Sequence, residues 1–185
     1  MRMNDDDEAL AQQAGRGDRE AFQLLLERHY DLVYRLAFRF LRNQTDAEDL
    51  TQDICVALPR KLKSFRGDSK FTTWLYRVTI NAARDQMRKR SNASKGQEQY
   101  VEAHAMAQAD AEANNSQVVW LYESLDQLGD DLRETAILVL AEDLSHAESG
   151  KVLGVKEGTI SWRMSEVRRQ LKQQWQAQSA DGVEP

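Results

Sequence analysis

The chain has few of the residues that interrupt helices or that build covalent frameworks. Its 185 residues include one cysteine, two prolines and nine glycines. A single cysteine excludes an internal disulfide, and without a CxxC pair the sequence has no pattern for a structural zinc site. The scarcity of proline, glycine and runs of β-branched residues favours helix throughout. We therefore expect an all-α protein that needs no metal and no cofactor.

Long hydrophobic runs are also missing. No segment approaches the roughly 18 successive apolar residues of a membrane span. Residues 1–8 are acidic, whereas a secretory signal is basic and then apolar. We therefore expect no membrane insertion and a cytoplasmic location, with residues 1–8 and 179–185 as frayed ends. A composition of 41% hydrophobic and 30% charged residues is typical of a globular protein.

Basic residues are scarce in one long stretch and concentrated in two others. The net charge of -5 argues against nucleic acid at first sight. Between residues 60 and 95, however, eleven lysines and arginines stand against only two acids. Residues 96–148 contain Arg133 as their one lysine or arginine, and a second basic stretch follows from 151 to 172. Such blocks favour a protein that touches DNA at two surfaces and presents acidic faces to another partner.

The first part of the chain predicts a helical bundle. Apolar residues recur at intervals of three and four from 18 to 41, which indicates one long helix or two abutting ones. Thr45 and Glu48 are spaced as a capping box, so a helix should begin there. Pro59 lacks an amide donor and should end or kink that helix near residue 58.

The next predicted helix, about 70–90, has two chemically different faces. One face is apolar and should pack inward: Phe71, Trp74, Leu75, Val78 and Ala82. Another carries donors at spacings of four, three and four: Arg77, Asn81, Arg84 and Arg88. Such a row can be a plain solvated surface. The neighbouring Lys89 and Arg90 favour contact with phosphates instead. For Trp74 the spacing favours the core over base stacking.

A second domain follows a polar stretch without apolar periodicity. We place the first domain at 10–93, a linker at 94–117 and the second domain at 118–176. Ser145 and Glu148 predict a capping box, and Gly154 predicts the end of the short helix that it opens. With the last helix, about 156–175, this is the pattern of a helix-turn-helix.

The last helix also has two predicted faces. Its core side should carry Ile160, Met164, Val167 and Leu171. Its outward side should carry Thr159, Trp162, Arg163, Glu166 and Arg169. Because Trp162 lies opposite the apolar stripe, contact with thymine methyl groups or with a covering protein is favoured over burial.

Five stretches stand in a specific order along the chain: Gly17–Phe22, Asp46–Asp53, Phe65–Asp68, Thr73–Arg77 with Asn81–Asp85, and Gly158–Ile160 with Arg163 and Arg168. Together they resemble the sigma-70 superfamily, specifically its small extracytoplasmic-function (ECF) group, over roughly residues 17–171. Each stretch alone is a weak signal. Their order across two domains makes the resemblance specific.

The sequence departs from this family at three places in its second domain. Ser161-Trp162 stands in the last helix where relatives often have a basic residue, so the resemblance does not supply the -35 sequence. Leu128-Gly129 stands where relatives usually have Leu-Pro, and Ser149-Gly150 stands where they usually have Ile-Ala. Glycine inside a helix costs about 1 kcal/mol relative to alanine. We therefore expect the helix around Gly150 to be less rigid than in relatives.

The resemblance implies an RNA polymerase sigma factor that directs core polymerase to promoters and initiates transcription. The first domain would be sigma region 2 and the second sigma region 4. The implied partners are the β′ clamp helices and β flap of core polymerase, promoter DNA and an anti-sigma factor. The polymerase-binding residues implied are Asp46, Glu48, Asp49, Leu50, Gln52 and Asp53, although an acidic helix face is otherwise an ordinary solvated surface.

The same resemblance assigns the DNA contacts to two sets. Those at the -10 element are Lys63, Arg66, Lys70, Arg77, Asn81, Arg84, Arg88, Lys89 and Arg90. Those at the -35 element are Lys156, Thr159, Ser161, Trp162, Arg163, Ser165 and Arg168. Among the latter, the basic residues suit phosphates, while Ser161, Trp162 and Ser165 suit base edges.

Two other functions fit parts of the pattern. A stand-alone helix-turn-helix regulator would bind operators without polymerase, but it leaves the first domain without a role. A helical adaptor or enzyme would show no salt-dependent DNA affinity. Against an enzyme, the candidate reactive side chains are scattered: Cys55, His29, His104 and His146.

Overall fold

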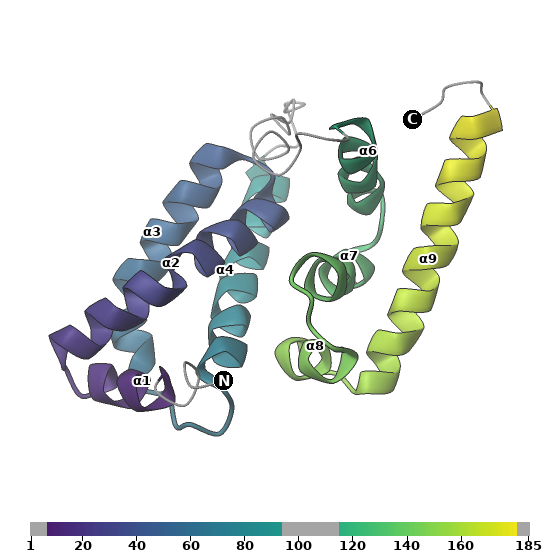
Figure 1. The fold of residues 1–185 in the computed structure, drawn as a ribbon. Coiled ribbons are helices and arrows are strands. Elements are labelled where there is room, and N and C mark those ends of the chain that lie inside the picture. The colour runs from purple at the N-terminus through teal and green to yellow at the C-terminus, as the bar shows by residue number, and fades with distance from the viewer. Residues whose placement is uncertain (1–6, 94–114, 181–185) are drawn as a thin grey trace. The chain divides into compact units, whose positions relative to one another are not determined.

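The computed structural model describes residues 7–93 and 115–180, and all regular structure in these ranges is helical. The chain divides into two compact units, residues 1–102 and 103–185 (Figure 1). The predicted all-α class with two helical domains is therefore confirmed. The predicted linker, 94–117, lies outside the described residues except for its last three.

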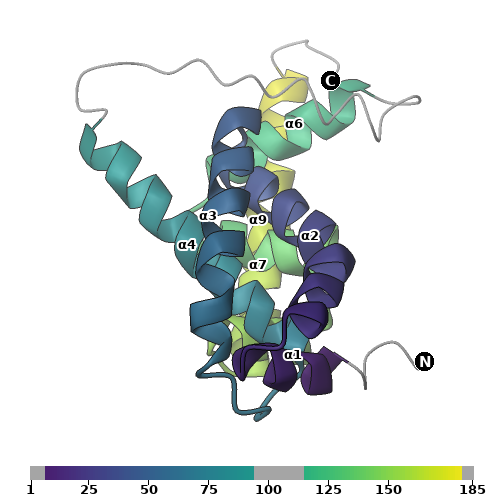
Figure 2. The same ribbon diagram turned by 90° about the vertical axis from the view of Figure 1, so that its left-hand side faces the viewer.

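The first unit contains four described helices: α1 (Asp7–Gly15), α2 (Arg19–Leu41), α3 (Gln44–Leu62) and α4 (Phe71–Ala93). Helix α2 packs against each of the other three (Figures 1 and 2). The most deeply buried large side chains come from α2, α3 and α4: Leu25, Leu36, Leu62, Phe71, Leu75 and Ile80. These residues form the core of the first unit.

Helix α3 begins and ends differently from the sequence prediction. The Asn43 side chain accepts a hydrogen bond from the Asp46 amide at 2.9 Å and is the N-cap. The predicted capping box at Thr45 is therefore wrong, because Thr45 already lies in the first turn. The predicted end near residue 58 is also wrong, since α3 continues past Pro59 to Leu62, while the alternative of a kink stays a prediction. Leu58 and Leu62 are both buried, and their packing offsets the loss of one helical hydrogen bond.

Helix α1 was not predicted, and its first residues were expected to fray. Asp7 and Glu8 instead begin a regular helix, and Asp7 is 3% exposed. Leu10, Ala11 and Ala14 bury the inner side of α1. The sequence signal is weak because this helix is short and rich in alanine and glutamine. At the other end of the chain, the predicted frayed residues Ser179 and Ala180 close the last helix.

The second unit contains α6 (Asn115–Asp126), α7 (Asp130–Ala136), the π-helical segment η1 (Ile137–Ala141), α8 (His146–Leu153) and α9 (Glu157–Ala180). The predicted capping box is confirmed, because Ser145 Oγ accepts from the Glu148 amide and Glu148 Oε2 accepts from the Ser145 amide. Gly154 ends α8 with φ of 71°, a left-handed conformation that favours glycine. Helices α8 and α9 therefore form the predicted helix-turn-helix.

Gly150 lies where α8 approaches the turn that follows it. A Cβ atom at this position would lie 2.8 Å from the Val155 carbonyl oxygen, which is too close. The Val155 amide also donates to the Gly150 carbonyl at 3.0 Å. Glycine therefore allows a tight turn here. Gly150 is itself buried within this contact, and the expected lower rigidity of the helix stays a prediction.

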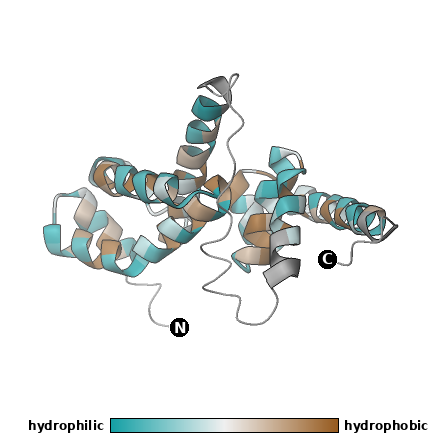
Figure 3. Cartoon of the chain, turned by 90° about the horizontal axis from the view of Figure 1, so that it is seen from above, coloured by the Kyte–Doolittle hydropathy of each residue, from teal (hydrophilic) through white to brown (hydrophobic). Residues whose placement is uncertain are grey.

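Hydrophobic and hydrophilic residues alternate along the helices of each unit (Figure 3). In the second unit, Leu125, Leu128, Ala136 and Val167 form a buried cluster. Trp120 of α6 meets Trp175 of α9 edge to face, with ring centroids 5.0 Å apart. No described helix combines the length and the apolar composition needed to cross a bilayer.

Candidate functional site

The donor row on α4 lies at the surface of the first unit. Arg77, Asn81 and Arg88 are exposed, and Arg84 is half-buried. Arg84 donates to Asn81 Oδ1 at 3.4 Å, and Arg88 pairs with Asp85 at 2.8 Å. Both side chains of the Arg88–Asp85 pair are well exposed, at 73% and 65%. Exposed pairs of this kind contribute at most about 1 kcal/mol, so phosphate can displace the carboxylate.

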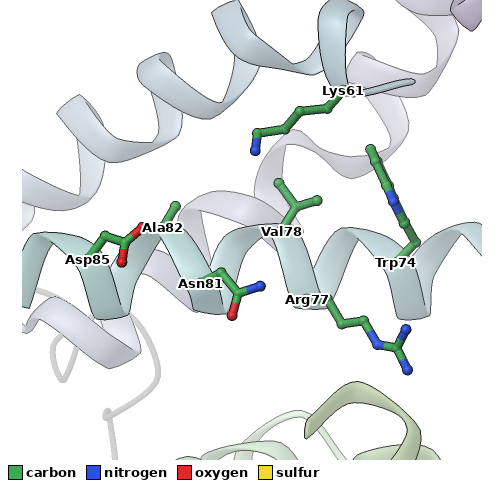
Figure 4. A pocket seen from close by; sticks show the side chains of 7 residues that line it. All are labelled: Lys61, Trp74, Arg77, Val78, Asn81, Ala82 and Asp85. Atoms are coloured by element: carbon green, nitrogen blue, oxygen red, sulfur yellow. The ribbon is translucent and has the colours of Figure 1, made fainter. Parts of the chain in front are cut away.

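A pocket of about 290 Å³ opens beside this row. It is lined by one residue of α3 and six of α4: Lys61, Trp74, Arg77, Val78, Asn81, Ala82 and Asp85. Lys61 extends from α3 toward α4, where Trp74 and Val78 point toward α3, while Arg77 and Asn81 leave α4 on another side (Figure 4). An aromatic ring, an amide and cationic groups thus surround one cavity.

The pocket corrects the prediction that the whole apolar face of α4 packs inward. Phe71 and Leu75 are buried as predicted, but Trp74, Val78 and Ala82 are only half-buried. The Trp74 ring packs against Phe65 at 5.5 Å and Phe71 at 5.8 Å between centroids. These contacts fix the indole while it still lines the pocket. Lys61, which lines the same cavity, was missed because it belongs to the preceding helix.

The remaining residues predicted at the -10 element divide into two groups. Lys63, Arg66 and Lys70, in the loop between α3 and α4, are exposed, as is Lys89. Arg90 is half-buried and forms an ion pair with Asp46 of α3. This pair joins a residue predicted to bind DNA to one predicted to bind polymerase, so Asp46 and Arg90 contribute to holding α3 and α4 together.

The acidic face of α3 is a separate surface. Glu48, Asp49, Gln52 and Asp53 are exposed as expected. Leu50 is 5% exposed and packs in the core, so it does not face a partner in this structure.

Val56 is a surface residue that sequence reasoning missed. It is 82% exposed, an unusual position for a valine on a helix with a well-packed core side. Its spacing of three from Asp53, four from Gln52 and seven from Asp49 places it on the same helix face. That spacing, opposite the buried Leu50 and Ile54, was the signal that could have found it. We call Asp49, Gln52, Asp53 and Val56 the α3 docking row.

Helix α9 presents the second predicted DNA surface. Trp162 is 65% exposed, which confirms its predicted outward position. The neighbouring polar and basic residues Lys156, Ser161, Ser165 and Arg168 are also exposed, and Thr159 is half-buried. Ser161 Oγ lies 2.9 Å from His146 Nδ1, which connects α9 to the start of α8.

Arg163 departs from its predicted outward position. Its side chain is only 11% exposed and pairs with Asp131 in the first turn of α7. Arg163 adjoins the buried Met164, and the edge of that apolar stripe faces α7. The guanidinium therefore braces α9 against α7. Sequence periodicity places Arg163 near the boundary between the faces but does not reveal Asp131.

Two pKa shifts concern ionisable groups on α9 and α3. Hydrogen bonds from Arg169 and Gln170 lower the pKa of Glu166 to about 2, so this carboxylate stays charged beside its arginine. Burial raises the pKa of the Cys55 thiol, which keeps it protonated and poorly nucleophilic near neutral pH. Within residues 7–93 and 115–180, no cluster of histidine, cysteine and carboxylate side chains is arranged to hold a metal ion.

Comparison with known proteins places this geometry in context. Residues 25–93 match the family described as Sigma-70 region 2. The chain is 30% identical over 176 residues to the ECF RNA polymerase sigma-E factor of Escherichia coli K12, covering 89% of this chain and 92% of that protein.

Two solved structures are similar over most of their length. CnrH, in complex with the cytosolic domain of CnrY, aligns with a TM-score of 0.69 and 27% identity, covering 92% of this chain and 97% of that one. The sigma factor RpoE of Bartonella quintana, in complex with the anti-sigma factor NepR, aligns with a TM-score of 0.67 and 26% identity. That match covers 82% of this chain and 94% of the other.

Proposed function

The chain belongs to the ECF group of the sigma-70 superfamily and is an RNA polymerase sigma factor, and on this basis we propose how its two units divide promoter recognition. The first domain, 10–93, docks on core polymerase and opens the -10 element. The second domain, 118–176, binds the -35 element, and residues 94–117 join the two. The observation that carries this proposal is the pocket beside the donor row on α4. No residue of the α3 docking row lines this pocket.

Strand opening needs a site that captures an unstacked base. Unstacking costs a few kcal/mol, and stacking on an aromatic side chain returns about 1–3 kcal/mol per base. In the pocket, Trp74 supplies the ring, Asn81 supplies amide groups for a base edge, and Lys61 and Arg77 supply positive charge. The exposed Lys63, Arg66, Lys70, Arg88 and Lys89, with the half-buried Arg84, then contact the phosphates on either side.

Recognition of the -35 element uses the exposed face of α9. Trp162 contacts thymine methyl groups, Ser161 and Ser165 contact base edges, and Lys156 and Arg168 contact phosphates. Thr159 lies at the edge of this face. Arg163 orients the helix through Asp131 and adds positive charge near the phosphates.

The α3 docking row binds the β′ clamp helices of core polymerase. Its carboxylates steer association, and the apolar Val56 adds a desolvated contact within a polar rim. Glu48 extends this row on its acidic side. The second unit contacts the β flap.

An anti-sigma factor is the third partner. The similar factor RpoE was solved in complex with the anti-sigma factor NepR, and the match covers 82% of this chain. We expect such a partner to hold this chain inactive in the cytoplasm. The protein is not itself an enzyme and uses no cofactor.

Run-off transcription with purified core polymerase tests the proposed function. Adding the chain to core polymerase and a pool of genomic fragments should give discrete, promoter-dependent transcripts. Core polymerase alone, and the chain alone, serve as controls. Tight operator binding by the chain alone, with no transcripts in the complete reaction, would instead support a stand-alone regulator.

A further inference from the structure

Helix α1 is fastened to the first unit by a buried carboxylate that promoter binding does not explain. Asp7 Oδ1 accepts a hydrogen bond from Arg28 at 2.7 Å, and Asp7 Oδ2 lies 2.8 Å from His29 Nε2. The Asp7 side chain is 4% exposed, and such a buried carboxylate is stable only when it is paired. The start of α1 is therefore held firmly on α2.

The next residue reaches a different helix. Glu8 Oε1 accepts a hydrogen bond from the backbone amide of Phe71 at 2.7 Å, across 63 residues of sequence. Phe71 is the first residue of α4, so its amide has no partner within that helix. A carboxylate at this end also interacts favourably with the helix dipole. Glu8 thus acts as an N-cap supplied from elsewhere in the chain.

Helix α1 also approaches the loop between α3 and α4 at two further points. A Cβ atom at Gly15 would lie 2.6 Å from the Leu62 carbonyl oxygen, so the end of α1 closely approaches the end of α3, where the loop begins. A Cβ atom at Gly67 would lie 3.1 Å from Gln12 Nε2, near the middle of the loop. Figures 1 and 2 both show α1 beside this loop.

The loop that α1 touches joins the two helices whose residues line the pocket, α3 with Lys61 and α4 with Trp74. Phe71, which Glu8 caps, is fully buried and packs against the rings of His29 and Trp74. Movement at the start of α4 would therefore move the indole that lines the pocket. The same loop carries three of the proposed DNA contacts, Lys63, Arg66 and Lys70.

We propose that α1 positions the loop of residues 63–70 for strand opening and that Glu8 is its principal positioning residue, an inference that rests on the proposed function. Glu8 touches no DNA in this scheme. It fixes the start of α4, and through Phe71 it fixes Trp74. Losing the carboxylate should impair opening of duplex DNA far more than docking on polymerase.

The experiment compares Glu8→Ala and Glu8→Gln with the unchanged protein, using full-length chains and core polymerase. Glu20→Ala is the matched control, because Glu20 is also an acid in the first turn of a helix in this unit and is exposed. Open-complex formation is followed on a duplex promoter and on the same promoter with a pre-opened mismatch at -10. Core affinity and thermal unfolding are measured for every variant.

Glu8→Ala should slow opening of the duplex promoter on the order of tenfold, in keeping with the loss of a helix cap. Glu8→Gln keeps an acceptor oxygen but not the charge, so its opening rate should lie between those of the unchanged protein and Glu8→Ala. The pre-opened template should restore most of the rate, with core affinity unchanged. Glu20→Ala should behave like the unchanged protein.

Wild-type opening rates in a folded Glu8→Ala chain would overturn the inference. Equal losses on both templates and in core affinity would also overturn it, because they would indicate general destabilisation. If Glu8→Ala does not fold, the same criteria apply to Glu8→Gln. Failure of the unchanged protein to open any promoter would instead count against the proposed function.

Discussion

At the scale of single residues, Val56 offers a test of the proposed polymerase interface. Val56→Ala removes apolar surface from the α3 docking row, and burying a valine contributes roughly 1.5–3 kcal/mol when burial is complete. Because the row is only partly apolar, we expect affinity for core polymerase to fall about fivefold. Titration of core with labelled protein measures this affinity.

Leu24→Ala provides a control for this substitution. Leu24 is 44% exposed on α2, so its removal also deletes exposed apolar surface from the first unit. Core affinity should stay within about twofold of the unchanged protein, as is usual for surface substitutions outside an interface. Equal losses in both variants would show that the effect is not specific to the docking row.

Sequence patterns at this scale predict exposure better than they predict pairing. The period of α9 correctly places Trp162 outside and Met164 inside. The same period cannot show that Arg163 meets Asp131, because that contact depends on how α7 packs against α9. The partners of Asp7 were also not predictable, because a single acid near the start of the chain belongs to no periodic pattern.

At the scale of secondary-structure elements, the turn between α8 and α9 depends on the absence of a side chain at residue 150. Gly150→Ala would place a methyl group 2.8 Å from the Val155 carbonyl oxygen. Overpacking of this kind costs about 1–3 kcal/mol, which exceeds alanine's advantage in helix propensity. Denaturant unfolding of the full chain should therefore show a less stable second unit.

Gly158→Ala is the matched control for this element. Apart from the adjacent residues and the nearby backbone of α9 itself, no atom lies within 4 Å of a Cβ at Gly158, and its φ is not in the left-handed region. This substitution should stabilise α9 by up to about 1 kcal/mol. A stabilised Gly150→Ala variant would mean that the turn adjusts easily.

Helix ends were predicted where the local chemistry was sufficient. Ser145 and Glu148 satisfy each other's backbone donors without help from other elements, so the sequence located α8 correctly. At α3, the N-cap is Asn43 and not the predicted Thr45, because the Asn43 side chain accepts from the Asp46 amide. Because α3 packs against other helices, it continues past Pro59, although helix propensity alone predicts an interruption there.

At the scale of the whole molecule, the separation of charge predicts that docking and promoter opening can be impaired independently. Arg84→Ala with Arg88→Ala removes two charges from the donor row on α4. Removing one arginine from a phosphate should reduce the slope of log affinity against log salt by about 0.9. We expect weaker promoter opening and a slope smaller by about 1–2, with core affinity unchanged. Promoter binding by the complex, measured across a salt series, gives this slope.

Arg16→Ala with Arg19→Ala is the corresponding control. Both residues are exposed and lie in the first unit, so the net charge changes equally. The salt slope should not change in this variant. Loss of core affinity in the Arg84 and Arg88 variant would indicate that the two faces have been assigned the wrong way round.

The broad organisation of the chain was predictable because charge and hydropathy change along the sequence in long blocks. The all-α class, the two helical units and the basic character of α4 all follow from such blocks. The pocket was not predictable, since it requires α3 to contribute Lys61 to the same cavity that Trp74 of α4 lines.

The hydrogen bond between Glu8 and Phe71 also sets an order of events during synthesis. Phe71 is added 63 residues after Glu8. At about 5–20 residues per second, the ribosome adds that stretch in about 3–13 s. During this interval the Glu8 carboxylate lacks the Phe71 amide that donates to it. The first unit is therefore completed only once the start of α4 has been synthesised.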